Sequence, residues 1–148
     1  MPSATTQVHG PGQAALTTAD IDWGGSSIYV ALFSSSWTPN PDTDDFLNDI
    51  VANEVTGTNW AANGQALGSM TVNVDTTNNE VEVRSADVSV ASVTLTGGKN
   101  FALINRTPGS DATRHIIASG VFDTALAPQG GTLLLDVNAT EGWFKYTY

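Results

Sequence analysis

Apolar and polar residues alternate along most of the chain from residue 66 onward, which is the pattern of half-buried β-strands. The clearest example is the segment TVNVDTTNNEVEVR, where valines alternate with polar residues on both sides of TTNN. Because Asn tolerates positive φ, TTNN is typical of a turn. The segment therefore predicts a hairpin with one buried apolar face and with Glu82 and Arg84 outside. The valines of the buried face are Val72, Val74, Val81 and Val83.

Other segments extend the β pattern over most of the chain. In SIYVALFS (residues 27–34) both parities are apolar, which predicts a strand covered on both sides. In DVSVASVTLT the apolar parity changes without a turn, which predicts a β-bulge near Ala91 and Ser92. Four more strands are expected in KNFALINR, RHIIASGVFD, GTLLLDVN and GWFKYTY. The expected fold is mainly β, an antiparallel sandwich or barrel of about eight strands.

One short helix is expected near residues 43–52. In DTDDFLNDIVANE, Phe46 and Ile50 are four residues apart, as are Leu47 and Val51, so an apolar stripe forms at helical spacing. The aspartates at positions 42, 44 and 45 would lie before or in the first turn, where the helix dipole favours negative charge.

The first 19 residues differ from the rest, because they are small, polar and interrupted by Gly and Pro. We expect an extended N-terminal arm over residues 1–19, ordered by contact with another chain, and a single β domain over residues 20–148. No signal peptide is expected, since a basic region and a continuous apolar region are missing. No apolar run reaches the roughly 18 residues that a membrane helix needs.

Charge narrows the choice of partners. The 148-residue chain has 15 acidic and 5 basic residues, a formal net charge of -10. Binding to nucleic acid requires clustered Lys and Arg, whereas the basic residues here are scattered singly. We therefore expect no contact with nucleic acid or with an anionic membrane. The absence of cysteine excludes disulfides and thiolate metal sites.

The acidic run from Asp42 onward has some features of a metal-binding loop. A calcium loop of the EF-hand type needs oxygen ligands at alternate positions followed by Gly. Phe46 stands where the third ligand would be, and no Gly follows. Helix capping and a solvated surface explain these acids more simply, so no metal ligand and no cofactor is expected.

Catalysis by a nucleophile needs a base beside it, and the two histidines are the obvious candidates. His9 falls in the expected arm, and His115 falls within an expected strand, as a packed or interfacial side chain. Neither has a recognisable catalytic neighbourhood, so no catalytic residue is assigned and no enzymatic activity is expected. The four tryptophans leave two alternatives open: a platform for stacking sugars, or plugs of the core or of an interface.

The order of several segments resembles a family of small structural proteins encoded by tailed bacteriophages. The resemblance spans about residues 19–108 and depends on ADIDW, IYVALFSSSWTPNPDTDDFLNDIVANEVTGTNW, TVNVDTTNNEVEVRSADVSV and TLTGGKNFALIN. NEVTGT is its most specific part. Departures are the N-terminal arm, Val90 where the family has an aromatic residue, and an unmatched C-terminal third. In NEVTGTNW we expect Gly57 to need an unusual φ and Trp60 to act as an anchor.

The resemblance implies a virion component, a head decoration (minor capsid or cement) protein that binds the outer surface of an icosahedral capsid and stabilises it. Its implied partners are the major capsid protein and further copies of itself, as a trimer. Candidate subunit or capsid contacts, which aromatic residues favour, are His9, Trp23, Trp143, Phe144, Tyr146 and Tyr148. The alternative for the aromatic tail is an ordinary last strand. Alternative functions are a minor tail or baseplate protein and a carbohydrate-binding module for host attachment.

Overall fold

The computed structural model describes residues 4–25, 27–139 and 141–147. Within these residues the strands are β1 (Ala4–Val8), β2 (Ile28–Phe33), β3 (Gln65–Ala66), β4 (Thr71–Asp75), β5 (Glu80–Arg84), β6 (Val88–Thr94), β7 (Gly98–Asn105), β8 (Ile116–Leu126), β9 (Gln129–Leu135) and β10 (Phe144–Thr147). The helices are α1 (Gly10–Thr17) and α2 (Leu47–Ile50), with 3-10 turns at Val51–Asn53 and Asp111–Thr113. The fold is mainly β and antiparallel, as the alternation predicted. Neither α-helix is long and apolar enough to span a membrane.

A five-stranded sheet in the order β1-β8-β7-β2-β3 forms the scaffold. Strand β2, which lies between β7 and β3, is apolar on both faces because both faces are covered. Val30 and Leu32 belong to one core, and Ala31 and Phe33 belong to a second core on the opposite face. The expectation of a strand covered on both sides is thus confirmed.

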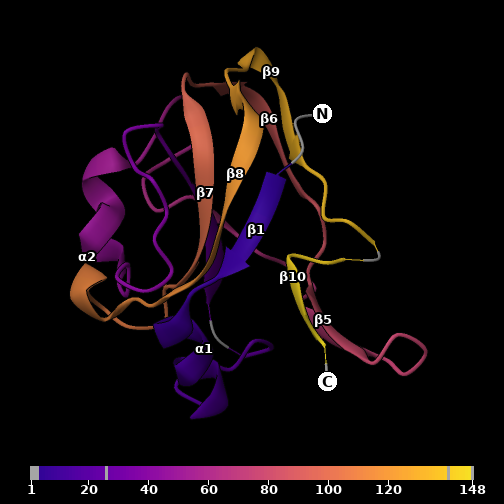
Figure 1. The fold of residues 1–148 in the computed structure, drawn as a ribbon. Helices are drawn as coiled ribbons and strands as arrows, with labels where there is room; N and C mark the ends of the chain where they lie inside the picture. Colours follow the sequence, from indigo (N-terminus) through magenta and orange to yellow (C-terminus); the bar gives the residue numbers. More distant parts are fainter. Residues whose placement is uncertain (1–3, 26, 140, 148) are drawn as a thin grey trace.

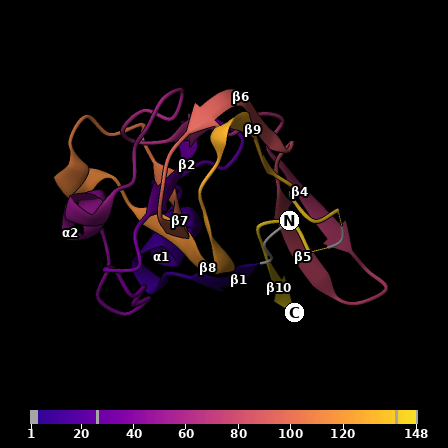
Figure 2. The same cartoon turned by 90° about the horizontal axis from the view of Figure 1, so that it is seen from above.

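The two faces of this main sheet are covered by different elements (Figures 1 and 2). On one face, α2 and the loop before it supply Leu47, Ile50 and Trp37. On the other face lie the two-stranded ribbon β6–β9 and the three-stranded sheet β10-β5-β4, which we call the small sheet. Figure 2 shows β6 and β9 arching between the main sheet and the small sheet. The architecture is therefore sandwich-like.

The ribbon β6–β9 contains the predicted β-bulge. The register of β6 against β9 shifts between Val90 and Val93. Ser92 has a φ of 55°, in the left-handed region. The extra residue lets Val88 and Val93 both point into the core although their parity differs.

The N-terminal segment is a correction to the expectation. Within its described part, residues 4–19, β1 pairs antiparallel with β8, from Ala4 opposite Phe122 to Val8 opposite Ala118. Helix α1 follows at once and lies so close to β8 that a Cβ on Gly12 would stand 2.2 Å from the carbonyl oxygen of Ile116. The expectation of an arm ordered by another chain is wrong for these residues, because they complete the main sheet of their own domain.

The expected helix over residues 43–52 exists but is shorter. It begins at Leu47, after Phe46 as N-cap, and the 3-10 turn continues it to Asn53. The carboxylate of Asp49 accepts hydrogen bonds from the backbone N–H groups of Asp45 (3.1 Å) and Phe46 (2.9 Å). A side chain inside the helix thus caps it, and the preceding aspartates lie in the loop.

The NEVTGTNW segment forms a tight turn held against β6. Trp60 is fully buried, which confirms its role as an anchor. Gly57 is needed for a different reason from the one expected. Its φ is outside the positive region, but a Cβ there would stand 2.1 Å from the carbonyl oxygen of Thr94. The residue with positive φ in this turn is Asn59, at 58°.

Candidate functional site

Among the described residues, His9 and Ser119 resemble a catalytic base and its nucleophile most closely. His9 Nε2 lies 2.8 Å from Ser119 Oγ, and His9 Nδ1 lies 2.9 Å from the backbone oxygen of Asp44. A carbonyl oxygen can only accept, so Nδ1 carries the proton and Nε2 accepts from the serine hydroxyl. This is the arrangement that activates a serine in hydrolases.

Because His9 and Ser119 are buried, no substrate can reach them. Both His9 and Ser119 are 0% exposed. Loss of hydration lowers the pKa of His9, against the opposing effects of the Asp44 carbonyl and of the Asp44 and Asp45 carboxylates. The neutral imidazole therefore joins β1, the Asp44 loop and β8. The pair is a structural link in the fold, and His9 is not available to contact another subunit as expected.

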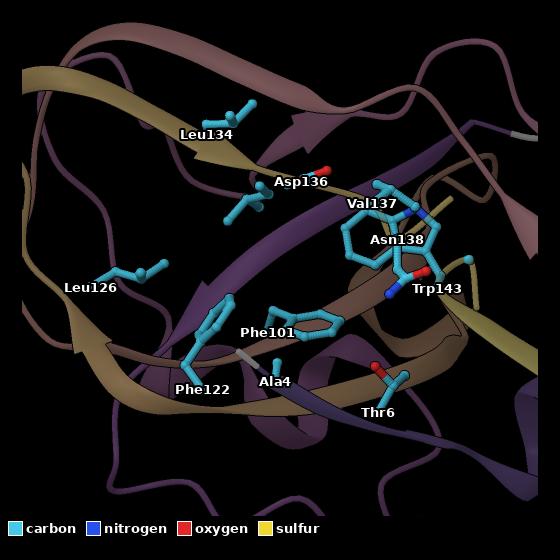
Figure 3. A pocket seen from close by; sticks show the side chains of 12 residues that line it. Ala4, Thr6, Phe101, Phe122, Leu126, Leu134, Asp136, Val137, Asn138 and Trp143 are labelled. Carbon is cyan, nitrogen blue, oxygen red and sulfur yellow. The ribbon is translucent and has the colours of Figure 1, made fainter. Parts of the chain in front are cut away.

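A cavity of about 240 Å³ lies between the inner face of the main sheet and β9 (Figure 3). Phe101, Phe122 and Trp143 line it, with ring centroids 5.4 Å apart for the Phe101–Phe122 pair and 5.5 Å for Phe101–Trp143. Asp136 and Asn138 add polar groups. Drug-sized ligands occupy pockets of roughly 300–1,000 Å³. The cavity is smaller, and its packed rings are typical of a gap between two layers.

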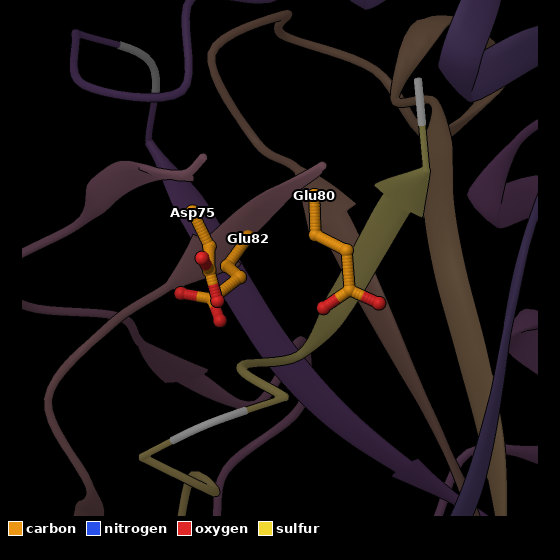
Figure 4. Close-up of side chains that lie close together, drawn as sticks. All are labelled: Asp75, Glu80 and Glu82. Atoms are coloured by element: carbon orange, nitrogen blue, oxygen red, sulfur yellow. The ribbon is translucent and has the colours of Figure 1, made fainter. Parts of the chain in front are cut away.

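Asp75, Glu80 and Glu82 form an acidic cluster on the small sheet, with carboxylate oxygens within 4.8 Å of one another (Figure 4). Each carboxylate already has a donor. Asn73 Nδ2 donates to Glu82 Oε2 at 2.7 Å, and the Arg84 guanidinium pairs with the same oxygen. Lys145 Nζ lies 3.0 Å from Glu80 Oε1. These bonds satisfy the cluster without a metal ion, so it is not assigned as a metal centre.

The predicted hairpin is the exposed feature that departs most from expectation. Its register is as predicted, with Val72 opposite Val83 and Val74 opposite Val81. Val83 is buried, but Val72 and Val74 are 54% and 56% exposed, and Glu82 is buried at 2%. The expected burial of Val72 and Val74, and the expected exposure of Glu82, are therefore wrong. The hairpin β4–β5 projects away from the rest of the fold (Figure 1), and among the described residues no element covers Val72 and Val74.

A groove of about 340 Å³ runs beside this apolar face. Its lining joins the hairpin to α1 and β10 and is formed by Gln13, Leu16, Thr17, Trp23, Val72, Val81, Val83 and Tyr146. Burial raises the pKa of Tyr146, and its ring stands 5.6 Å from that of Phe144. The sequence pattern identified the valines of this surface but could not show that Val72 and Val74 remain exposed to solvent.

The other expected contact residues lie in the core. Trp23, Trp143 and Phe144 are 6 to 8% exposed, and Tyr146 is partly buried. Tyr148 lies outside the described residues. Because β10 pairs with β5 from Phe144 opposite Val83 to Thr147 opposite Glu80, the aromatic tail is an ordinary last strand of a sheet.

The tryptophans and the acidic run have structural roles. All four tryptophans, at positions 23, 37, 60 and 143, are at most 8% exposed. A sugar-stacking platform needs exposed rings, so their burial argues against it. Asp44 Oδ2 accepts from Trp37 Nε1 at 2.9 Å and from the Asn40 backbone at 2.8 Å. His115 is half-buried, with its ring 4.6 Å from that of Phe46.

Comparison with known protein families, with curated proteins and with solved structures finds no match to this chain.

Proposed function

We propose that the chain is a structural binding protein without enzymatic activity. The support is chemical. In the described part of the chain, the pair that resembles a base and a nucleophile is buried, and the carboxylates of the acidic cluster already accept hydrogen bonds from their own neighbours. What the fold offers to a partner is an apolar face at the end of the small sheet.

More specifically, we propose a head decoration protein of a tailed bacteriophage, bound to the outside of an icosahedral capsid. The observation that carries this proposal is the ordered resemblance over residues 19–108, with NEVTGT as its most specific segment. The tight placement of Gly57 and Trp60 gives a physical reason for such a segment to be retained in a family. The net charge of -10 fits an outer surface better than the lining of a DNA-filled shell.

The proposed assembly is a trimer located where three capsid subunits meet. A cap at such a position contacts all three subunits and resists their separation under the pressure of packaged DNA. Binding only to the assembled shell stabilises that shell by mass action. Many symmetric copies can do so although each makes modest contacts.

Labelling intact virions with gold-conjugated antibodies against the chain tests the location. If the chain is a head decoration protein, the gold label should be distributed over the head. Label confined to the tail would replace it with a tail or baseplate role, and the absence of label from purified particles would overturn the virion role altogether.

Loss of the gene tests the stabilising role. Particles without the protein should release DNA at a lower temperature or a lower salt concentration than wild-type particles. Adding the purified chain back should restore the wild-type threshold. Equal thresholds with and without the chain would contradict a cementing function.

A further inference from the structure

Within the described residues, β4 is the last strand of the small sheet and no strand pairs with its outer edge. The sheet order is β10-β5-β4, so β5 pairs with β4 on one side and with β10 on the other. The carbonyl oxygen of Val83 accepts from Trp143 N at 2.8 Å, so the backbone of Val83 points toward β10. Val72 is opposite Val83. It therefore belongs to a non-hydrogen-bonded pair, and its N–H and C=O point to the open edge, as do those of Val74 two residues on.

The same two residues carry the exposed apolar side chains. Val72 and Val74 are more than half exposed, and Val72 borders the groove beside Leu16 and Tyr146. Natural proteins protect edge strands with charge, proline or a covering element, because an open apolar edge pairs with other chains. Here Val72 and Val74 combine an open edge with an apolar face, which is the geometry of a strand-addition site.

The opposite face of the hairpin carries unbalanced negative charge. Asp75 and Glu80 are directly opposite each other, and like charges in this position destabilise a strand pair. Lys145 pairs with Glu80 and with Glu141. Asp75 instead accepts from Asn78 and from the backbone of Thr77, and these hydrogen bonds, led by that of the Asn78 side chain, lower its pKa. A cation on an added strand would relieve this repulsion at the β4 edge.

A second copy of the chain is poorly suited to supply that cation, because its five basic side chains already have partners. Three of them pair with carboxylates: Arg84 with Glu82, Arg114 with Asp111, and Lys145 with Glu80 and Glu141. Lys99 donates to the backbone carbonyl oxygens of Phe122 and Asp123. The guanidinium carbon of Arg106 lies 4.4 Å from the centroid of the Tyr29 ring, a cation–π contact. Two copies would also bring together two molecules of charge -10.

We propose that β4 is a docking edge for an extended strand of a partner protein whose residues alternate between apolar and basic. The apolar residues of that strand cover Val72 and Val74 and continue the apolar face over the groove. The basic residues lie on the opposite face beside Asn73 and Asp75. The added strand would be the fourth of the small sheet, and its backbone would bond to the N–H and C=O groups of Val72 and Val74.

The test uses the purified chain and two capped seven-residue peptides, at about 0.15 M salt, where the Debye length is about 8 Å, and with a chelator present. One peptide has the sequence Thr-Lys-Val-Lys-Val-Lys-Thr, and the other has Glu in place of each Lys. The Lys peptide should bind about tenfold more tightly or better. In hydrogen exchange followed by NMR, it should slow the amides of Val72 and Val74 selectively.

Variants separate the contributions of the edge, the face and the charge. Val74→Pro removes one edge N–H without removing a bond of the β4–β5 ladder. The double variant Val72→Ser with Val74→Ser removes the apolar face. Both should weaken the Lys peptide about tenfold or more, while the matched control Val121→Ser, at a valine 39% exposed elsewhere, should not. Asp75→Asn should reduce the preference for Lys over Glu.

Several results would overturn the proposal. These are equal binding of the two peptides, no binding, or equal loss in the Val121→Ser control and the double serine variant. Dimerisation of the free chain with protected Val72 and Val74 amides would assign the edge to a second copy instead. Because these measurements need only the isolated chain, their failure is distinguishable from failure of the proposed virion role, under which the partner strand belongs to the capsid.

Discussion

The main sheet and the small sheet use similar residues, yet they differ in how their faces and edges are covered. In the main sheet, β2 and β7 are covered on both faces, and the edge next to β8 is closed by β1. In the small sheet, the apolar face is buried at Val83 on β5 and at Phe144 on β10, while Val72 and Val74 on the edge strand β4 remain in water. Alternation alone therefore distinguishes the two faces of a strand, but it does not show which strands of a sheet the core covers.

The main sheet and the hairpin β4–β5 have separate roles, in stability and in binding. The main sheet carries the stability of the domain, since most fully buried large side chains lie in it or pack directly on it. The hairpin β4–β5 projects from this scaffold and contributes little burial at its tip. Elements that bind partners are commonly drawn from such regions of low local stability.

The largest effect should come from the doubly covered strand. Phe33 is fully buried, with its ring 4.9 Å from that of Trp37. Phe33→Ala should lower the free energy of unfolding by about 3–5 kcal/mol, because it leaves a cavity in a closed core. Urea denaturation measures this change. A loss below about 1 kcal/mol would mean that this face of the sheet is far less tightly packed than described.

Two aspartate substitutions on one face of the hairpin should differ strongly. Val83→Asp places a carboxylate in the core and should cost several kcal/mol, about 2–4. Val74→Asp places it in water and should change stability by at most about 0.5 kcal/mol. Comparing the two urea midpoints tests where the burial of the hairpin ends. Equal costs would show that the tip is covered, or that the register is wrong.

The link between β1 and the scaffold should have an intermediate effect. His9→Ala leaves Ser119 and the Asp44 carbonyl without their partner and should cost about 1–3 kcal/mol. Amides of β1 should then exchange faster, while those of β7 should change less. Unchanged stability would restore the idea that the N-terminal segment is an independent arm.

The smallest effect concerns pH. Because burial lowers the pKa of His9 below 6.5, the unfolded chain takes up the proton first as the pH falls. Stability from this residue should be constant well above pH 6.5. It should fall as the pH is lowered through 6.5 toward the folded pKa, by at most about 1.4 kcal/mol per pH unit. Subtracting the pH profile of His9→Gln isolates this contribution from those of the carboxyl groups, and identical profiles would contradict it.

Local patterns predicted the features that depend on neighbouring residues. The strand at residues 28–33, the hairpin register and the bulge at Ser92 all follow from alternation and turn chemistry within a few positions. The short helix was predicted for the same reason. The helix begins at Leu47, later than the pattern indicates, because aspartates near a helix start resemble caps whether or not they lie in the helix.

Features that depend on distant residues could not be predicted. His9 is held by Asp44 and Ser119, which are 35 and 110 positions away, so its segment had no local signal of order. Gly57 is required by the approach of Thr94, not by its own φ. Likewise, the exposure of Val72 and Val74 depends on the pairing of β10 with β5, which brings together residues about 60 positions apart and sets where the core ends.

Native-state hydrogen exchange of the free chain, resolved by residue, tests the central contrast most directly. Amides in β2, β7 and β8 should exchange only through global unfolding, because these strands are paired and covered. The amides of Val72 and Val74, which point to the open edge, should exchange at rates near those of exposed peptides. Protection of Val72 and Val74 equal to that of β7 would contradict the account, because it would mean that the edge of β4 is already closed.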